Sequence, residues 1–180
     1  MKTKKQIVLI ISLFVISGSL WGQNKKNYTN IHDLKGINQT YEIGDGEIGY
    51  GVWNKQNKCK DITPTFLGFE VIPPIKITNK VTLDALVREH LKPYFLNQNS
   101  FSYSYLYIYL YTDIYGNIKE IYIRYPKNIG IIPGNVIEQF EIALLKSNVK
   151  LLFDKNNRVF KNSQWIGREV MYRADKMKDL

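Results

Sequence analysis

The side chains most often used for nucleophilic, acid–base and metal chemistry are scarce in this chain. Its 180 residues include one cysteine, Cys59, and two histidines, His32 and His90. A catalytic nucleophile needs a base, which near neutral pH is usually histidine. His32 lies in a polar segment, and His90 falls on the apolar side of an expected helix, where a buried structural role is favoured. Neither Cys-x-x-Cys nor His-x-x-x-His occurs, so we expect no catalytic set, no metal site and no cofactor.

A glycine-rich stretch, Gly44-Asp45-Gly46-Glu47-Ile48-Gly49-Tyr50-Gly51, is the nearest approach to a phosphate-binding loop. It lacks the Gly-Lys-Ser/Thr ending, and β-type segments flank it on both sides, so no helix follows to receive a phosphate. A β-hairpin with its turn in residues 44–47 is the better interpretation. The 16 acidic residues include no pair that the sequence singles out. An envelope glycan hydrolase that uses unidentified carboxylates therefore stays an alternative.

Tyrosine is the residue type with the most unusual distribution. Nine of the 13 tyrosines lie between residues 94 and 125, and in the segment 103–111 they occupy every odd position. Aromatic faces with polar tips suit sugar rings and protein partners. The alternative is that these tyrosines are simply good strand formers packed under another segment. The candidate partner-binding face consists of Tyr105, Tyr107, Tyr109, Tyr111, Tyr122 and Arg124.

Strict alternation predicts the strand that positions these tyrosines. Leu106, Ile108 and Leu110 occupy the even positions, so residues 102–111 form a strand with one aliphatic and one tyrosine face. Residues 118–125 form its antiparallel partner. Only one register keeps each face consistent, because a slip by one residue would set Leu110 against Glu120. That register pairs Leu110 with Ile121, Ile108 with Ile123, Tyr109 with Tyr122, and Tyr107 with Arg124.

The remaining patterns predict two helices and further strands. One helix begins near Thr82, its N-cap, and ends or kinks near Pro93. The other follows Pro133, with Asn135 and Glu138 as a capping box. Strands are expected at residues 39–43, 48–53, 66–72, 149–153 and 166–172. The fold class is therefore α+β, an antiparallel sheet of hairpins with two helices packed on one face.

The N-terminus has the layout of a secretory signal. Three lysines within residues 2–5 precede an apolar run at residues 7–16 and a small, polar segment ending at Gly22, which favours cleavage over a retained membrane anchor. No cysteine lies at the cut, so a lipoprotein is not expected. We expect a signal peptide at 1–22, a flexible lead-in at 23–36, and a single α+β domain at 37–180. The protein is then periplasmic or secreted, with no stable membrane span after cleavage.

The charge distribution bears on the partners. After signal removal the chain holds 22 basic and 16 acidic residues, and most of the excess lies from Lys146 to the end. These basic residues are interspersed with acidic ones, which favours a solvated surface. Nucleic acid is not expected as a partner of an exported chain. Another envelope protein or a glycan is the expected partner.

The segment from residue 100 to 172 carries a resemblance. Its pattern Ile132-Pro133-x-x-Val136…Phe140-Glu141…Leu144-x-Lys146-x-Asn148, and the lysine-rich signal ending in Gly-Gln, are similar to small secreted Bacteroidota proteins of unknown function. More loosely, the hairpin, helix and following strands resemble the C-terminal domain of TonB-type proteins, which bind partners by adding a strand. The long Pro-rich spacer of true TonB is missing. The resemblance implies no catalytic residues.

These observations lead to one functional expectation. The chain is an exported, non-enzymatic binding domain of unspecified ligand, which uses its tyrosine face or an exposed sheet edge.

Overall fold

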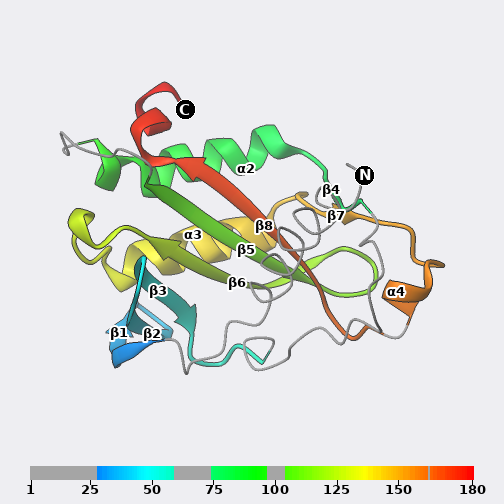
Figure 1. The fold of residues 1–180 in the computed structure, drawn as a ribbon, viewed down its shortest axis with the longest axis horizontal. Helices are drawn as coiled ribbons and strands as arrows, with labels where there is room; N and C mark the ends of the chain where they lie inside the picture. Colours follow the sequence, from blue (N-terminus) through cyan, green and yellow to red (C-terminus); the bar gives the residue numbers. More distant parts are fainter. Residues whose placement is uncertain (1–27, 59–73, 97–103, 162) are drawn as a thin grey trace, which may run out of the picture.

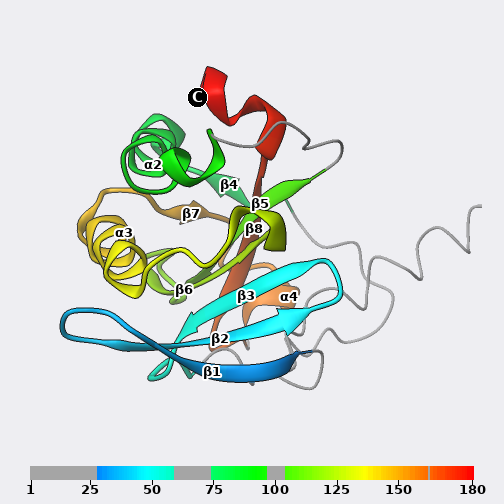
Figure 2. The same cartoon turned by 90° about the vertical axis from the view of Figure 1, so that its left-hand side faces the viewer.

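The computed structural model describes residues 28–58, 74–96, 104–161 and 163–180. A six-stranded sheet in the order β1-β2-β3-β6-β5-β8 forms the body of the protein, and a second small sheet pairs β4 with β7. Every pairing is antiparallel. Helices α2 and α3 lie together on one side of the six-stranded sheet (Figures 1 and 2). The α+β class, with two helices on one face, is confirmed.

The elements follow the chain in a simple order. The strands are β1 (Thr29–Lys35), β2 (Thr40–Gly46), β3 (Gly49–Asn54), β4 (Lys76–Ile77), β5 (Tyr105–Thr112), β6 (Ile118–Tyr125), β7 (Leu151–Leu152) and β8 (Ile166–Arg173). The helices are α2 (Lys80–Leu86), α3 (Gly134–Lys146) and the short α4 (Arg158–Lys161). Tighter or wider turns continue some of them: η3 (Val87–Leu91), η4 (Lys92–Phe95), η5 (Lys127–Ile129) and η6 (Ala174–Asp179). None of the described helices is long and apolar enough to cross a membrane.

The main core lies between the helices and the aliphatic face of the sheet. Leu106, Ile108 and Leu110 of β5 are fully buried there. Residues spaced at the helical period on α2, η3 and α3 pack against them: Leu83, Val87, Leu91, Ile137, Phe140 and Leu144. Each such side chain contributes about 1.5–3 kcal/mol on burial. Both helices therefore bury one stripe of their surface at the helical period.

The register between β5 and β6 is also confirmed. Leu110 faces Ile121, Ile108 faces Ile123, and Tyr109 faces Tyr122. A bulge at the turn end of the hairpin places Thr112 opposite Ile118, so the connection is longer than two residues. The Asp113 carboxylate closes this turn by accepting the backbone N–H groups of Tyr115 (2.9 Å) and Asn117 (3.0 Å).

Several expectations about local structure are wrong. Residues 29–35 belonged to the expected flexible lead-in, but they pair with β2 as the edge strand β1, because pairing satisfies their backbone groups despite their polar side chains.

The first hairpin turns at Glu47-Ile48, two residues later than expected, since β2 extends to Gly46. Helix α2 begins at Lys80, not at Thr82. Signal residues 1–22, Cys59 and the expected strand 66–72 lie outside the described residues.

The capping box at the start of α3 is wrong as well. No side chain caps this helix, and Glu138 instead turns to the loop between β1 and β2. Its carboxylate accepts the backbone N–H groups of Ile37 and Asn38, the latter at 3.0 Å. A tertiary contact has replaced a local one, because the loop donors have no strand partner of their own.

A second glutamate of α3, Glu141, is buried against the hairpin of β2 and β3. It accepts hydrogen bonds from the Tyr41 hydroxyl (2.6 Å) and from Asn54 Nδ2 (3.1 Å). Burial raises the pKa of Glu141, although these two hydrogen bonds lower it. At Glu138, burial works in the same upward direction, but the hydrogen bonds from Asn38 and Ile37 outweigh it and lower the pKa. The contributions of the two carboxylates to the free energy of unfolding therefore change with pH in opposite directions.

We predict that Glu141→Gln reduces the loss of stability on going from acid to neutral pH. A carboxyl group whose pKa is raised by folding stabilises the protein below its unfolded pKa, about 4.3, and this contribution is lost as pH rises through the folded pKa. Urea unfolding at a series of pH values should show a flatter profile above about pH 4 for the variant than for the wild type.

Glu138→Gln is the matched control, with the opposite sign. Because folding lowers this pKa, the contribution of Glu138 is present above its unfolded pKa and disappears as pH falls. The variant should lose about 1–2 kcal/mol at neutral pH and approach the wild type in acid. If both variants changed the pH profile in the same direction, this account of the two carboxylates would be wrong.

Candidate binding face

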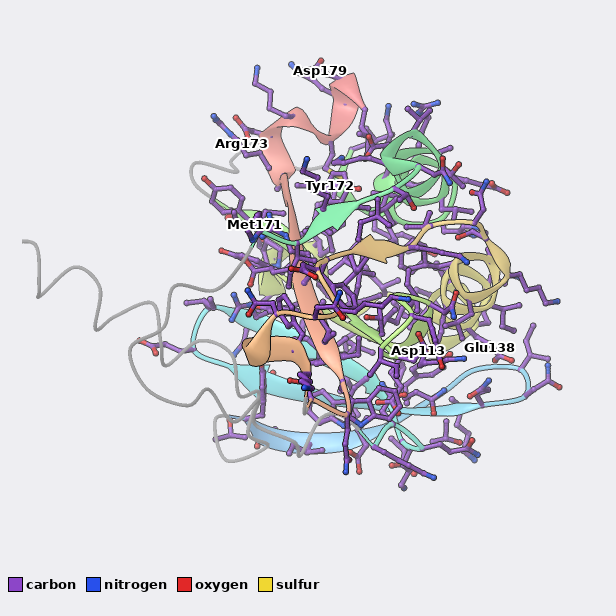
Figure 3. All side chains as sticks on the ribbon, turned by 90° about the vertical axis from the view of Figure 1, so that its right-hand side faces the viewer. Asp113, Glu138, Met171, Tyr172, Arg173 and Asp179 are labelled. Carbon is purple, nitrogen blue, oxygen red and sulfur yellow. The ribbon has the colours of Figure 1, made fainter. Side chains whose placement is uncertain are left out.

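All six residues of the candidate partner-binding face lie on the sheet surface opposite α2 and α3. Neighbouring residues in a strand point to opposite faces, and the even positions of β5 enter the main core. Figure 3 shows the same alternation in β8, with Tyr172 on the helix side and Met171 and Arg173 on the other. We call this surface the aromatic face. It carries Tyr28, Trp53, Tyr105, Tyr107, Tyr109, Tyr111, Tyr122 and Arg124.

The strand registers arrange this face in rows that cross the sheet. One row has an aromatic bar with a carboxylate at each end: Glu42, Trp53, Tyr122, Tyr109 and Glu169. The next row, two residues along, consists of Gly44, Gly51, Arg124, Tyr107 and Met171. Residues far apart in the sequence thus become neighbours at the spacing between strands, about 4.8 Å.

The aromatic bar is tightly packed. The rings of Trp53 and Tyr122 are stacked at 5.8 Å between centroids, and Tyr109 lies 5.2 Å from Tyr122. Trp53 Nε1 donates to Glu42 Oε2 at 2.6 Å, which satisfies the indole. Tyr122 is only 3% exposed and Tyr109 9%, and burial raises the pKa of Tyr122 well above its usual value. These three rings form a second, smaller core.

Three glycines make room for Tyr28 beside this small core. A Cβ atom placed on Gly44 or Gly46 would lie within 3 Å of the Tyr28 side chain, and one on Gly51 would meet both Tyr28 and Tyr122. The Tyr28 ring lies 5.4 Å from Trp53, and its hydroxyl is hydrogen-bonded to that of Tyr122. The glycine-rich stretch that resembled a phosphate loop is therefore a floor for an aromatic ring.

Arg124 lies in the next row, among the tyrosines. Its guanidinium carbon is 4.2 Å from the ring centroid of Tyr107 and 5.8 Å from that of Tyr109. Burial alone would lower the pKa of Arg124, but Tyr109 and Tyr122 outweigh it and raise the pKa, so the group stays charged. Among the described residues, Arg124 Nε is the only buried side-chain nitrogen or oxygen without a hydrogen-bond partner.

The predicted face is therefore partly closed and partly open. Tyr109 and Tyr122 are buried, which agrees with the packing alternative at these two positions, while Tyr105, Tyr107, Tyr111 and Arg124 are half-buried. Met171, which sits opposite Tyr107, is 58% exposed. The accessible part of the face is the end formed by Tyr105, Tyr107, Arg124 and Met171. The function of this face stays a prediction.

Sequence reasoning missed several members of the face. Trp53, Glu42 and the glycine floor arrive through the pairing of β3 with β6, and no local pattern shows which strands become neighbours. A local signal for one of them exists, because alternation along residues 48–53 puts the Trp53 and Val52 side chains on different faces of the strand. Met171 and Glu169 arrive through β8 for the same reason.

Two carboxylates on this face are neighbours, because Asp33 of β1 lies directly opposite Glu42, one strand spacing or about 4.8 Å away. Asp33 is ion-paired with Lys55 at 2.9 Å, and Glu42 accepts a hydrogen bond from Trp53 Nε1. Glu42 and Glu169 stand four strand spacings apart, about 19 Å. Glu120, opposite Tyr111, is two strands and two residues from each of them, about 12 Å. Glycosidase pairs lie about 5–9.5 Å apart.

Within the described ranges, no group of three histidine, cysteine, aspartate or glutamate residues could hold a metal ion. His90 packs edge-on against Phe140 at 6.3 Å, outside this face.

Comparison with known proteins adds information on the fold. No protein-family model matches the chain, and no curated protein matches it. The structure is similar to the crystal structure of a DUF5043 family protein from Bacteroides uniformis, with a TM-score of 0.55 and 15% sequence identity, over 82% of this chain and 93% of that one. This neighbour is consistent with the resemblance to Bacteroidota proteins of unknown function. The likeness to TonB stays a prediction.

We predict that Gly51→Ala destabilises the protein by about 1–3 kcal/mol. The added Cβ would lie 2.5 Å from the Tyr122 hydroxyl oxygen and 2.7 Å from Tyr28 Cε1, so Tyr28 must leave its floor. Urea unfolding measures the effect.

Gly167→Ala is the control on the same face. Its Cβ would meet Tyr111 at an ordinary 3.6 Å, so we expect no loss and a gain of up to about 1 kcal/mol from the stiffer unfolded chain. Equal destabilisation by both variants would refute the glycine-floor interpretation.

Proposed function

We propose that the chain is an exported, non-enzymatic binding domain of the periplasm or cell surface, and that it holds another envelope macromolecule on the aromatic face. The observation that carries this proposal is the open end of that face. Tyr105, Tyr107 and Met171 are partly or largely accessible there, next to a charged guanidinium that no described side chain neutralises.

Two physical arguments support a binding role for this end. Aromatic rings and methionine present a large, adaptable contact area, and tyrosine adds a polar tip. The open end also rests on a rigid support, because the adjoining rings of Trp53, Tyr109 and Tyr122 are immobilised in the small core. A preorganised surface loses little side-chain entropy when it binds.

The hydrolase alternative receives less support. Glu42, Glu120 and Glu169 arise from backbone positions about 12–19 Å apart on the aromatic face, and in the one close pair, Asp33 and Glu42, the carboxylates are bound to Lys55 and Trp53. Glu138 and Glu141 lie closer together on α3, but both are buried and hydrogen-bonded to the β1–β2–β3 region. The accessible carboxylate that has a close neighbour, Asp33, is held in an ion pair with Lys55.

The test is a quantitative pull-down from envelope extract with residues 23–180 immobilised. We expect the wild type to retain a partner that Tyr105→Ala/Tyr107→Ala loses by about tenfold or more, because these rings supply the contact area. The bound fraction is measured over a dilution series.

Tyr115→Ala is the matched control, since Tyr115 is 65% exposed in the turn after β5, outside the aromatic face. It should retain the partner fully. A thermal unfolding scan confirms that each variant is folded. Equal retention by the wild type and the folded double variant would overturn the proposal, as would the absence of any retained partner.

A further inference from the structure

Arg124 is held in a way that a purely structural arginine is not. Nothing in the described part of the chain forms an ion pair with it, and its buried Nε has no partner. The guanidinium is instead positioned by tyrosine rings, above all by Tyr107 at 4.2 Å. Leaving a buried polar group unpaired costs stability, and such an exception beside an accessible surface is a candidate for contact with a ligand.

The hydrogen-bonding geometry of the guanidinium limits the chemical class of ligand that it can bind. Its planar fork of N–H donors matches a carboxylate through two parallel hydrogen bonds, and a partly dry, ring-lined setting strengthens that contact. Because Nε alone is buried without a partner, the terminal nitrogens are the ones that an incoming anion can reach. Tyr107 and Tyr105 lie on the adjoining strand, where a sugar ring attached to that anion can pack one of its C–H faces against them.

The charges around Arg124 limit the density of negative charge on the ligand. Glu42, Glu120 and Glu169 occupy the same face of the sheet. They would repel a nucleic acid duplex, which carries one negative charge about every 1.7 Å of its axis, more strongly than a chain with one carboxylate per sugar ring. Arg173, which lies opposite Tyr105 on this face, is already paired with Asp175 at 2.7 Å. A ligand with one carboxylate per sugar ring therefore fits Arg124, the cation among the rings that has no ion-pair partner in the described part of the chain.

From these observations we infer that Arg124 is a carboxylate subsite and that the ligand of the aromatic face is an acidic glycan containing uronic acid residues. The sugar ring lies against Tyr107 and Tyr105, and its carboxylate meets the terminal nitrogens of Arg124. This inference rests on the proposed function and specifies the class of its ligand.

The experiment measures binding of defined oligosaccharides to residues 23–180 by titration calorimetry. The probes are oligomers of galacturonic, glucuronic and mannuronic acid, each compared with the neutral oligomer of the parent sugar. We expect the wild type to prefer at least one acidic oligomer over its neutral counterpart. Arg124→Met, which keeps the apolar stem without the charge, should lose about tenfold or more of that affinity. Arg124→Lys keeps the positive charge but lacks the planar pair of N–H donors, so its affinity for the acidic oligomer should lie between those of the wild type and Arg124→Met.

Two controls separate this inference from the proposed function. Arg168→Met removes a charge from an exposed position on β8 and should bind as the wild type does. Tyr107→Ala should weaken the binding of both acidic and neutral oligomers, since it removes the ring.

If Arg124→Met bound acidic oligomers as tightly as the folded wild type does, the carboxylate subsite would be refuted. The binding face would still stand if Tyr107→Ala lost affinity in the same titration. If no acidic oligomer bound the wild type, the acidic-glycan inference would fall, and the pull-down with the Tyr105/Tyr107 variant would decide the proposed function separately.

Discussion

The burial of β5 is the constraint on which the rest of the structure depends. This strand is hydrogen-bonded to β6 on one side and β8 on the other, and its three aliphatic side chains are fully covered by the helices. A shift of one residue would bring tyrosines into that core and aliphatic residues out of it. The register of β6 and β8, and the direction in which every tyrosine of β5 points, follow from this one arrangement.

The two faces of the sheet are packed in different ways. The helix side is a conventional apolar core, in which the polar residues that enter, Glu138 and Glu141, are satisfied by the loop and hairpin beside them. These contacts also tie α3 to the β1–β2–β3 part of the sheet. The other side is held by stacked rings and a glycine floor, and it keeps a charge among them. The two faces are thus stabilised by different interactions.

Arg124 shows what that division implies. In the main core an unpaired cation would be strongly destabilising. Among tyrosines it gains cation–π attraction, of the order of 1 kcal/mol for each well-placed ring, and its tip keeps access to solvent. The rings therefore act as a holder that leaves the hydrogen-bonding edge of the guanidinium unused. Within the described part of the chain, Arg124 is thus stabilised by rings and by no ion pair.

The sequence by itself determined the class of the fold, the two helices, the β5–β6 register, and the gathering of the six candidate residues on one face. All of these follow from the periodicity of apolar side chains, which is local information. Only the tertiary structure decided that β3 pairs with β6, that Trp53 and Tyr28 complete the aromatic cluster, and that β1 is a strand. It also decided that Tyr109 and Tyr122 are buried while Tyr107 and Arg124 remain partly accessible. The pairing of β3 with β6 joins residues about 70 positions apart. Such contacts depend on which strands become neighbours and on how side chains fill the space between them, and no local pattern encodes that choice.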